Sequence, residues 1–347
     1  MNNIRKAVAL ISGGLDSMLA AKTIMAQGIH VEGINFYTGF CVEGHTHAIR
    51  NKDQAKPKRN NALWVAEQLG IKLHIIDIVE EYKQIVLKPK HGYGAHLNPC
   101  LDCKIFMVKK AREWMEENNF DFIITGEVIG QRPKSQRKVT MPIVAEQSGA
   151  NERLLRPLCA KNLAPTLPEW EGWVQRELLH NFSGRSRTPQ FALAKQFAIE
   201  DFAQPAGGCC FLTNEHYSAK LADLWKTRGK REYELDDIML LKIGRHLRPA
   251  PHFKLIIGRD EGENNFLEGY RSQFVNLRPI SHVGSLALID GEPTAEDIYL
   301  AAQIVARYGA GRTENKVTIE VNSQGGATWP LEVTPMAANA ILQQWYV

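Results

Sequence analysis

The sequence feature that most constrains the fold is a glycine-rich turn near the N-terminus. Residues 7–11 form a short apolar run, which is typical of a buried parallel strand. The turn Ser12-Gly13-Gly14-Leu15-Asp16-Ser17 follows directly, and apolar residues at helical spacing predict a helix over 16–27. Successive backbone N–H groups and a helix N-terminus form an anion site, and glycines let a phosphate approach closely. The turn therefore predicts a phosphate-binding loop.

The side chains of this turn indicate a nucleotide bound together with a metal ion. Ser12 and Ser17 can add hydroxyl donors, and Asp16 can hold a magnesium ion that bridges phosphates. The turn lacks the Lys-Ser/Thr end of the Walker loop and the spaced glycines of the Rossmann fingerprint. The alternative is an ordinary strand-to-helix turn that Ser and Asp cap.

Predicted strands and helices alternate through the first 130 residues. This alternation predicts an α/β fold with a doubly wound parallel sheet, in which ligands lie beyond the carboxyl ends of the strands. Those ends hold the phosphate loop, Thr38 to Cys41, and Gly126-Glu127. The strands are predicted over 7–11, 31–36, 73–77 and 120–125, and the helices over 16–27, 60–69 and 101–117.

At the phosphate loop the chain resembles the PP-loop ATP pyrophosphatase superfamily, whose signature is Ser-Gly-Gly-x-Asp-Ser and whose fold is adenine nucleotide alpha hydrolase-like. Members activate a carbonyl oxygen or a carboxylate by adenylation and release pyrophosphate. The resemblance implies that ATP and Mg²⁺ are cofactors, that Asp16 is catalytic, and that adenine lies near Asn35 and Phe36. The implied cofactor-binding residues are Ser12, Gly13, Gly14, Asp16, Ser17, Asn35, Phe36 and Gly126.

The chain has 347 residues, which at about 150 residues per domain allows two or three domains. We expect a nucleotide-binding domain over 1–150, a helical and loop-rich extension over 151–248, and a small α+β domain over 249–347. The lack of any uncharged apolar stretch of 18 residues argues against a membrane partner. The apolar run at the N-terminus is too short for a signal peptide, so we expect a cytoplasmic protein.

Six cysteines are too few for a disulfide framework in a chain of this length, so their clustering points to metal binding or catalysis. Cys100 and Cys103 form a Cys-x-x-Cys that opens a helix, and Cys209 and Cys210 follow two glycines. Three interpretations stay open: a redox dithiol or thiol relay without metal, a structural zinc ion bound by four cysteines, and an iron–sulfur cluster. A cluster with three protein thiolates would leave one iron open to sulfur or substrate.

The segments around these cysteines resemble tRNA-thiolating members of the PP-loop superfamily. Asn98-Pro99-Cys100-Leu101-Asp102-Cys103 resembles the cysteine segment of the tRNA thiouridylases, and residues 125–131 resemble the Thr-Gly-Glu-x-x-Gly-Gln of the 4-thiouridine synthetases. Pro205 to Cys209 resembles the late cysteine of the cluster-dependent tRNA thiolases. The resemblance implies a [4Fe-4S] cluster whose metal ligands come from Cys100, Cys103 and either Cys209 or Cys210. It also implies catalytic roles for Cys100, Cys103 and Cys209.

The remaining cysteines and a histidine pair carry weaker signals. Cys159 lies between apolar neighbours, which favours packing, whereas Cys41 follows a strand end where substrate would pass. His45 and His47 could suggest a metal site, but such a pair in a loop is more often solvated.

Three basic segments flank the predicted site, which suits a phosphodiester backbone. They are residues 50–59, 132–138 and 185–187. From about 251 to 308 the chain resembles the RNA-binding domain of the NFACT family, with Lys254, Arg259, Arg271 and Arg278 as the expected phosphate contacts. The alternative for this domain is a structural or a dimerising role. A dimerising role would make the protein a homodimer.

Together these features predict an ATP-dependent tRNA sulfurtransferase, with tRNA as substrate and inorganic sulfide or a persulfide carrier as sulfur donor. ATP would adenylate the carbonyl oxygen of a uridine or similar base, and sulfur would then displace AMP. One alternative is an adenylating enzyme that acts on a small metabolite. Another is a non-catalytic RNA-binding or redox-sensing protein that retains the nucleotide site.

Overall fold

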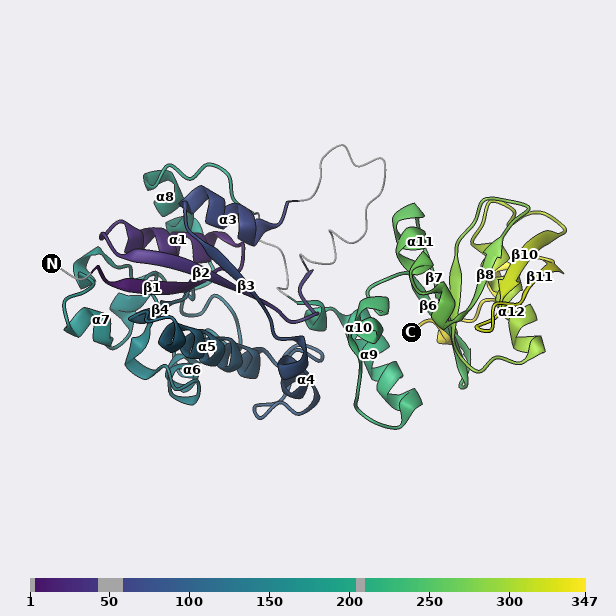
Figure 1. The fold of residues 1–347 in the computed structure, drawn as a ribbon, viewed down its shortest axis with the longest axis horizontal. Helices are drawn as coiled ribbons and strands as arrows, with labels where there is room; N and C mark the ends of the chain where they lie inside the picture. Colours follow the sequence, from purple (N-terminus) through teal and green to yellow (C-terminus); the bar gives the residue numbers. More distant parts are fainter. Residues whose placement is uncertain (1–3, 43–58, 204–209) are drawn as a thin grey trace. The chain divides into compact units, whose positions relative to one another are not determined.

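The computed structural model describes residues 4–42, 59–203 and 210–347, and these fall into two compact units (Figure 1). The described part of the first unit is 4–42, 59–203 and 210–213, and the second unit is described over 214–347. Among the helices of these described ranges, none is long and apolar enough to cross a membrane.

The first unit is built on a parallel sheet in the strand order β3-β2-β1-β4-β5. The strand order reverses at β1, so the crevice beyond the carboxyl ends of β1 and β4 is the expected ligand position. The phosphate loop leaves β1 at this point. The strands are β1 (Lys6–Leu10), β2 (His30–Tyr37), β3 (Leu73–Asp77), β4 (Phe122–Ile124) and β5 (Leu154–Leu155).

Helices cover both faces of this sheet, which confirms the predicted doubly wound α/β fold (Figure 1). Successive residues of a strand point to opposite faces; accordingly Ala7 and Ala9 pack with α1, α3 and α8, whereas Val8 packs with α5 and α6. The helices are α1 (Leu15–Met25), α3 (Asn61–Leu69), α4 (Val79–Leu87), α5 (Cys100–Glu117), α6 (Thr140–Gln147), α7 (Leu167–Trp170) and α8 (Thr188–Gln196).

The second unit pairs two helices with a small α+β domain, of which the α+β part was predicted. Its sheet has the order β11-β10-β8-β9-β7-β6, and every pair in it is antiparallel. The strands are β6 (Arg245–Ala250), β7 (Phe253–Ile257), β8 (Val275–Pro279), β9 (Ala287–Gly291), β10 (Val317–Asn322) and β11 (Thr328–Val333). The helices are α9 (Glu215–Arg228), α10 (Leu235–Leu240), α11 (Glu261–Glu268) and α12 (Ala295–Arg307).

The predicted boundary between 248 and 249 lies within β6, and the division into three segments stays a prediction. Proline lacks an N–H for the ladder, but β6 is the edge strand of its sheet and tolerates Pro249. What each predicted segment contributes to function stays a prediction.

Candidate nucleotide and sulfur-transfer site

Helix α1, which follows the phosphate loop, has no side-chain cap at its N-terminus within the described residues. The residue before the helix, Gly14, is extended at φ −90° and ψ 158°, and no side chain accepts from the first helical N–H groups. The first N–H groups of a helix have no partner within the helix, and their dipoles favour a negative charge. The loop therefore has the backbone arrangement that the phosphate prediction requires.

Two glycines allow the loop to pack against neighbouring segments. Gly13 has φ +78°, and a Cβ there would lie 2.7 Å from the Cβ of Asn61. A Cβ at Gly126, beyond β4, would lie 2.5 Å from the carbonyl carbon and oxygen of Asp16. Gly126 is therefore placed directly against the phosphate loop.

The two serines of the loop bond within the loop. The Ser17 hydroxyl donates to the Gly14 carbonyl oxygen at 2.8 Å, and the Ser12 backbone N–H donates to Ser17 Oγ at 3.3 Å. Ser12 Oγ lies 3.4 Å from Ser17 Oγ. Each hydroxyl has a single hydrogen, so either serine would have to exchange its bond within the loop for one to a phosphate.

Asp16 presents the feature that best fits a divalent cation. Its Oδ2 accepts from Gln131 Nε2 at 2.6 Å and lies 3.6 Å from a guanidinium nitrogen of Arg187. Its Oδ1 is buried and has no hydrogen-bond partner among the described residues. A buried polar atom without a partner costs free energy, and carboxylate oxygens are the ligands that Mg²⁺ prefers. Asp16 therefore fits the predicted metal role.

Asn35 and Phe36 lie at the end of β2 and face different surroundings. Asn35 Nδ2 donates to the Ile11 carbonyl oxygen at 2.7 Å, which ties the ends of β1 and β2 together. The Phe36 side chain is buried in the core between the sheet and α5. The adenine position near these two residues stays a prediction.

A buried ion pair behind Gly126 was not predicted from the sequence. Arg156 Nε lies 3.1 Å from Glu127 Oε2, which also accepts from the Thr125 hydroxyl at 2.8 Å. Burial raises the pKa of Glu127, but the charges of Arg156 and Lys104 and the hydrogen bonds outweigh it and leave the pKa below its ordinary value. A charge pair 29 residues apart leaves no pattern in the sequence.

Cys159 is buried beside this pair, as the packing prediction required. Its thiol donates to the Glu127 carbonyl oxygen at 3.2 Å. Burial raises the pKa of Cys159 to about 12, although the charge of Arg156 acts in the opposite direction. A thiol with so high a pKa is a poor nucleophile or metal ligand at neutral pH.

Cys100 and Cys103 lie one turn apart at the start of α5. Cys100 is the first helical residue, and the Cys103 N–H donates to the Pro99 carbonyl oxygen at 2.8 Å. The Cys100 thiol donates to the buried Ser135 hydroxyl at 3.3 Å. Ser135 lies in the basic segment 132–138, so one hydrogen bond joins the Cys-x-x-Cys to that segment.

The later cysteines are described only in part. Cys210 is paired with Cys41 by one antiparallel β-bridge, and the Phe211 N–H donates to the Phe40 carbonyl oxygen at 3.0 Å. Cys209, His45 and His47 lie outside the described residues. Within 4–42, 59–203 and 210–347, no three His, Cys, Asp or Glu side chains are grouped so that they could hold a metal ion.

Two of the three basic segments are described in full. Lys134, Arg137 and Lys138 are exposed in the second segment, and Arg185 is exposed in the third. In the first segment, 50–58 lies outside the described residues, and Arg59 pairs with the carboxylate of Asp201. Arg187 of the third segment lies beside Asp16 instead of facing outward with Arg185.

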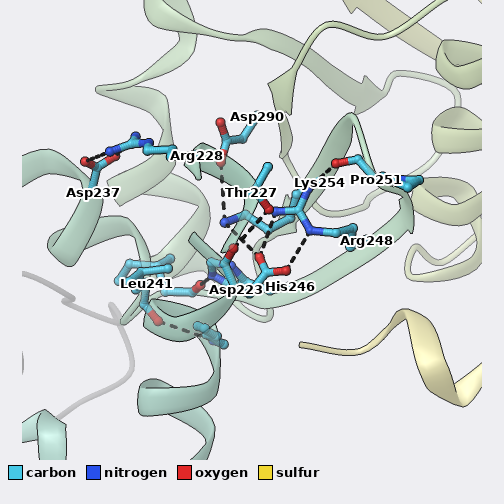
Figure 2. Close-up of polar contacts among 12 residues, drawn as sticks. Asp223, Thr227, Arg228, Asp237, Leu241, His246, Arg248, Pro251, Lys254 and Asp290 are labelled. Carbon is cyan, nitrogen blue, oxygen red and sulfur yellow. Dashed lines mark hydrogen bonds and ion pairs between the residues drawn. The ribbon is translucent and has the colours of Figure 1, made fainter. Parts of the chain in front are cut away.

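In the second unit, the prediction that Lys254 contacts phosphate is wrong. Lys254 is 1% exposed, and its ammonium lies 3.4 Å from Asp290 and 3.9 Å from Asp223 (Figure 2). Arg248 also pairs with Asp223, at 2.7 Å (Figure 2), so these charges join α9 to the sheet. The other three predicted contacts are partly exposed and paired on the surface: Arg259 with Glu263, and Arg271 and Arg278 with Glu268.

Known families match both units of the chain. Residues 5–156 match the family described as the tRNA methyl transferase HUP domain, and residues 244–346 match the NFACT protein RNA binding domain. These matches confirm the resemblance to PP-loop, thiouridylase-like proteins and the resemblance of the C-terminal domain to the NFACT type.

Individual relatives cover smaller parts. A tRNA-specific 2-thiouridylase MnmA from Mesoplasma florum is 30% identical over 145 residues, which are 39% of this chain and 38% of the relative. A protein from Thermococcus kodakarensis described as a probable tRNA sulfurtransferase is 29% identical over 143 residues, which are 41% of this chain and 34% of that protein. The chain thus spans little more than a third of these curated relatives.

Among solved structures, a 4-thiouridine synthetase–RNA complex with bound ATP is similar to this chain. The likeness covers 56% of this chain and 53% of that chain, at 20% sequence identity and a TM-score of 0.34.

Proposed function

We propose that the protein is an ATP-dependent tRNA sulfurtransferase. The observation that carries the proposal is the uncapped phosphate loop that contains Asp16, whose buried Oδ1 has no partner within the part of the chain that the structure describes. This loop lies within the residues that match the tRNA methyl transferase HUP domain, and relatives that match 39% and 41% of the chain are named for tRNA thiolation.

The reaction proceeds in two displacements. The carbonyl oxygen of a uridine or similar base attacks the α-phosphorus of ATP, and pyrophosphate leaves. Sulfur then attacks the activated carbon, the carbon–oxygen bond breaks, and AMP leaves. The loop N–H groups and Ser17 would bind the phosphates, and Asp16 would hold Mg²⁺, which would supply positive charge against the charge that develops on the phosphate oxygens. Adenylation is needed because a carbonyl oxygen is a poor leaving group.

The cysteines supply the sulfur in this proposal. Cys100 and Cys103 lie one helical turn apart and offer two thiolates for a [4Fe-4S] cluster, and a third would come from Cys209 or Cys210. A bound cluster would hold the transferred sulfur on its open iron. The alternative that needs no cluster is a persulfide on one of these cysteines, to which a persulfide carrier passes its outer sulfur and is left as a thiol. After that sulfur attacks the base, the thiol of a second cysteine breaks the S–S bond, which leaves a disulfide between the two cysteines. Inorganic sulfide would instead attack the activated carbon itself.

The partner in this proposal is tRNA. Exposed Lys134, Arg137 and Lys138 lie on the segment that contacts the Cys-x-x-Cys, and exposed Arg185 lies on the segment whose Arg187 pairs with Asp16. A phosphodiester backbone can run along these two segments. The second unit matches an RNA-binding domain, which supports a second point of contact. Base extrusion would then bring the target base to the site.

The test measures pyrophosphate and AMP release by the full-length protein with Mg²⁺, ATP, sulfide and tRNA. We expect release that requires tRNA, and we expect its loss in Asp16→Asn but not in the exposed control Glu67→Gln. Pyrophosphate exchange without RNA would favour a metabolite-adenylating enzyme, and no AMP with any substrate would favour a non-catalytic protein. Anaerobic purification with iron and sulfide analysis separates the cluster from the persulfide route.

A further inference from the structure

The amide side chains of Gln131 and Gln190 connect α8 to Asp16. Gln131 Nε2 lies 2.6 Å from Asp16 Oδ2, and Gln190 Nε2 lies 3.1 Å from Gln131 Oε1. An ionised carboxylate can only accept, so Gln131 presents its NH₂ to Asp16 and its oxygen to Gln190. The direction of each hydrogen bond is therefore fixed, and the chain of amides holds the carboxylate in one orientation.

The burial of Gln190 indicates that these hydrogen-bonded amides do more than fill space in the core. Gln190 is 0% exposed, and its own oxygen is buried without a hydrogen-bond partner in the described ranges 4–42, 59–203 and 210–347. An apolar residue of similar size would avoid the cost of that unpaired oxygen. The amide is therefore explained by what its NH₂ group does for Gln131 and Asp16.

The arginine next to α8 reaches the same carboxylate. Arg187 immediately precedes the helix, and its guanidinium lies 3.6 Å from Asp16 Oδ2, which is an ion pair longer than a hydrogen bond. The backbone places it there, because the Gly184 N–H donates to the Ile129 carbonyl oxygen at 2.7 Å and Ser183 forms a β-bridge with Ile129. The planar fork of arginine suits phosphate oxygens.

We infer that Arg187 binds the nucleotide phosphates and that Gln190 is a positioning residue that orients Asp16 through Gln131. The inference rests on the proposed function in one respect, which is that ATP binds at the phosphate loop. On nucleotide binding the Arg187 guanidinium exchanges the Asp16 carboxylate for phosphate oxygens. Asp16, held in place by Gln131, would then present its Oδ1 to the metal without reorienting. The extension beyond residue 150 thus completes the nucleotide site.

The test is calorimetry of the full-length protein with Mg²⁺ and a non-hydrolysable ATP analogue, without tRNA or sulfide. Arg187→Ala should raise the Kd of the nucleotide about tenfold, and Arg187→Lys should restore part of it. Gln190→Leu should raise the Mg²⁺ concentration for half-maximal binding about tenfold and leave affinity at saturating Mg²⁺ within about twofold. Lys195→Ala and Gln196→Leu, both exposed on α8, are the matched controls.

The outcomes separate this inference from the proposed function. If the wild type binds the analogue and both Arg187→Ala and Gln190→Leu bind as the controls do, the inference is overturned and the proposed function stands. If the wild type does not bind the analogue, the proposed function is overturned as well. Gln131→Leu breaks the same series of hydrogen bonds at a less buried position. It should raise the Mg²⁺ concentration for half-maximal binding by the same factor, so it serves as the test if Gln190→Leu does not fold.

Discussion

At the scale of single residues, Gly126 fixes the position of the phosphate loop. A Cβ there would lie 2.5 Å from the Asp16 backbone, so Gly126→Ala must displace the loop. We expect the Kd for Mg·ATP to rise about tenfold and the free energy of unfolding to fall by about 1–3 kcal/mol. Calorimetry and urea unfolding measure the two effects. Gly325→Ala is the control, because the nearest atom to its added Cβ would be 3.8 Å away. If Gly126→Ala bound Mg·ATP as the wild type does, that result would contradict the position of Gly126 against the phosphate loop.

The buried Glu127–Arg156 pair gives a second prediction at this scale. Glu127→Gln leaves the Arg156 charge without its partner, so we expect the free energy of unfolding at pH 7 to fall by about 3–5 kcal/mol. Because folding lowers the pKa of Glu127, its contribution is present above the unfolded pKa and is lost as pH falls through the folded pKa. The difference between wild type and variant in urea unfolding should therefore shrink in acid. A difference that grows in acid would contradict this assignment.

At the scale of elements, the start of α5 should separate the two chemical steps. Cys100→Ser and Cys103→Ser keep the phosphate loop intact, so we expect tRNA-dependent pyrophosphate release to persist while thionucleoside formation falls below detection. Cys159→Ala is the control, since its thiol is buried and donates to the Glu127 carbonyl oxygen. This variant should keep both steps and lose about 1 kcal/mol of stability. Thiolation that survives in Cys100→Ser and Cys103→Ser would remove these cysteines from the mechanism.

Some elements of the fold could be predicted from the sequence alone, and others could not. Strand β3 matches its predicted bounds of 73–77, where Leu73, Ile75 and Ile76 supply the apolar side chains. The edge strand β6 was missed because Pro249 looks like a break until the sheet order is known. Gln190 carried no signal, since its bond to Gln131 joins residues 59 positions apart and only the fold brings them together. Motifs thus predicted the loop, and tertiary contacts supplied the residues that orient it.

At the scale of the whole molecule, tRNA binding should depend on salt through the exposed basic segments. Each lysine that contacts a phosphate releases about one counterion, so Lys138→Ala should lower the slope of log K against log salt concentration by about 1. Lys254→Met should leave that slope unchanged, because Lys254 is buried between Asp223 and Asp290. Filter binding over a range of salt concentrations measures both slopes, and equal slopes for wild type and Lys138→Ala would exclude that contact.

The most direct measurement of the central claim is mass spectrometry of tRNA nucleosides from a strain that lacks this protein. We predict that one thionucleoside disappears, returns with the wild-type gene, and does not return with Asp16→Asn. A strain that keeps every thionucleoside at its normal level would contradict the assignment of tRNA sulfur transfer.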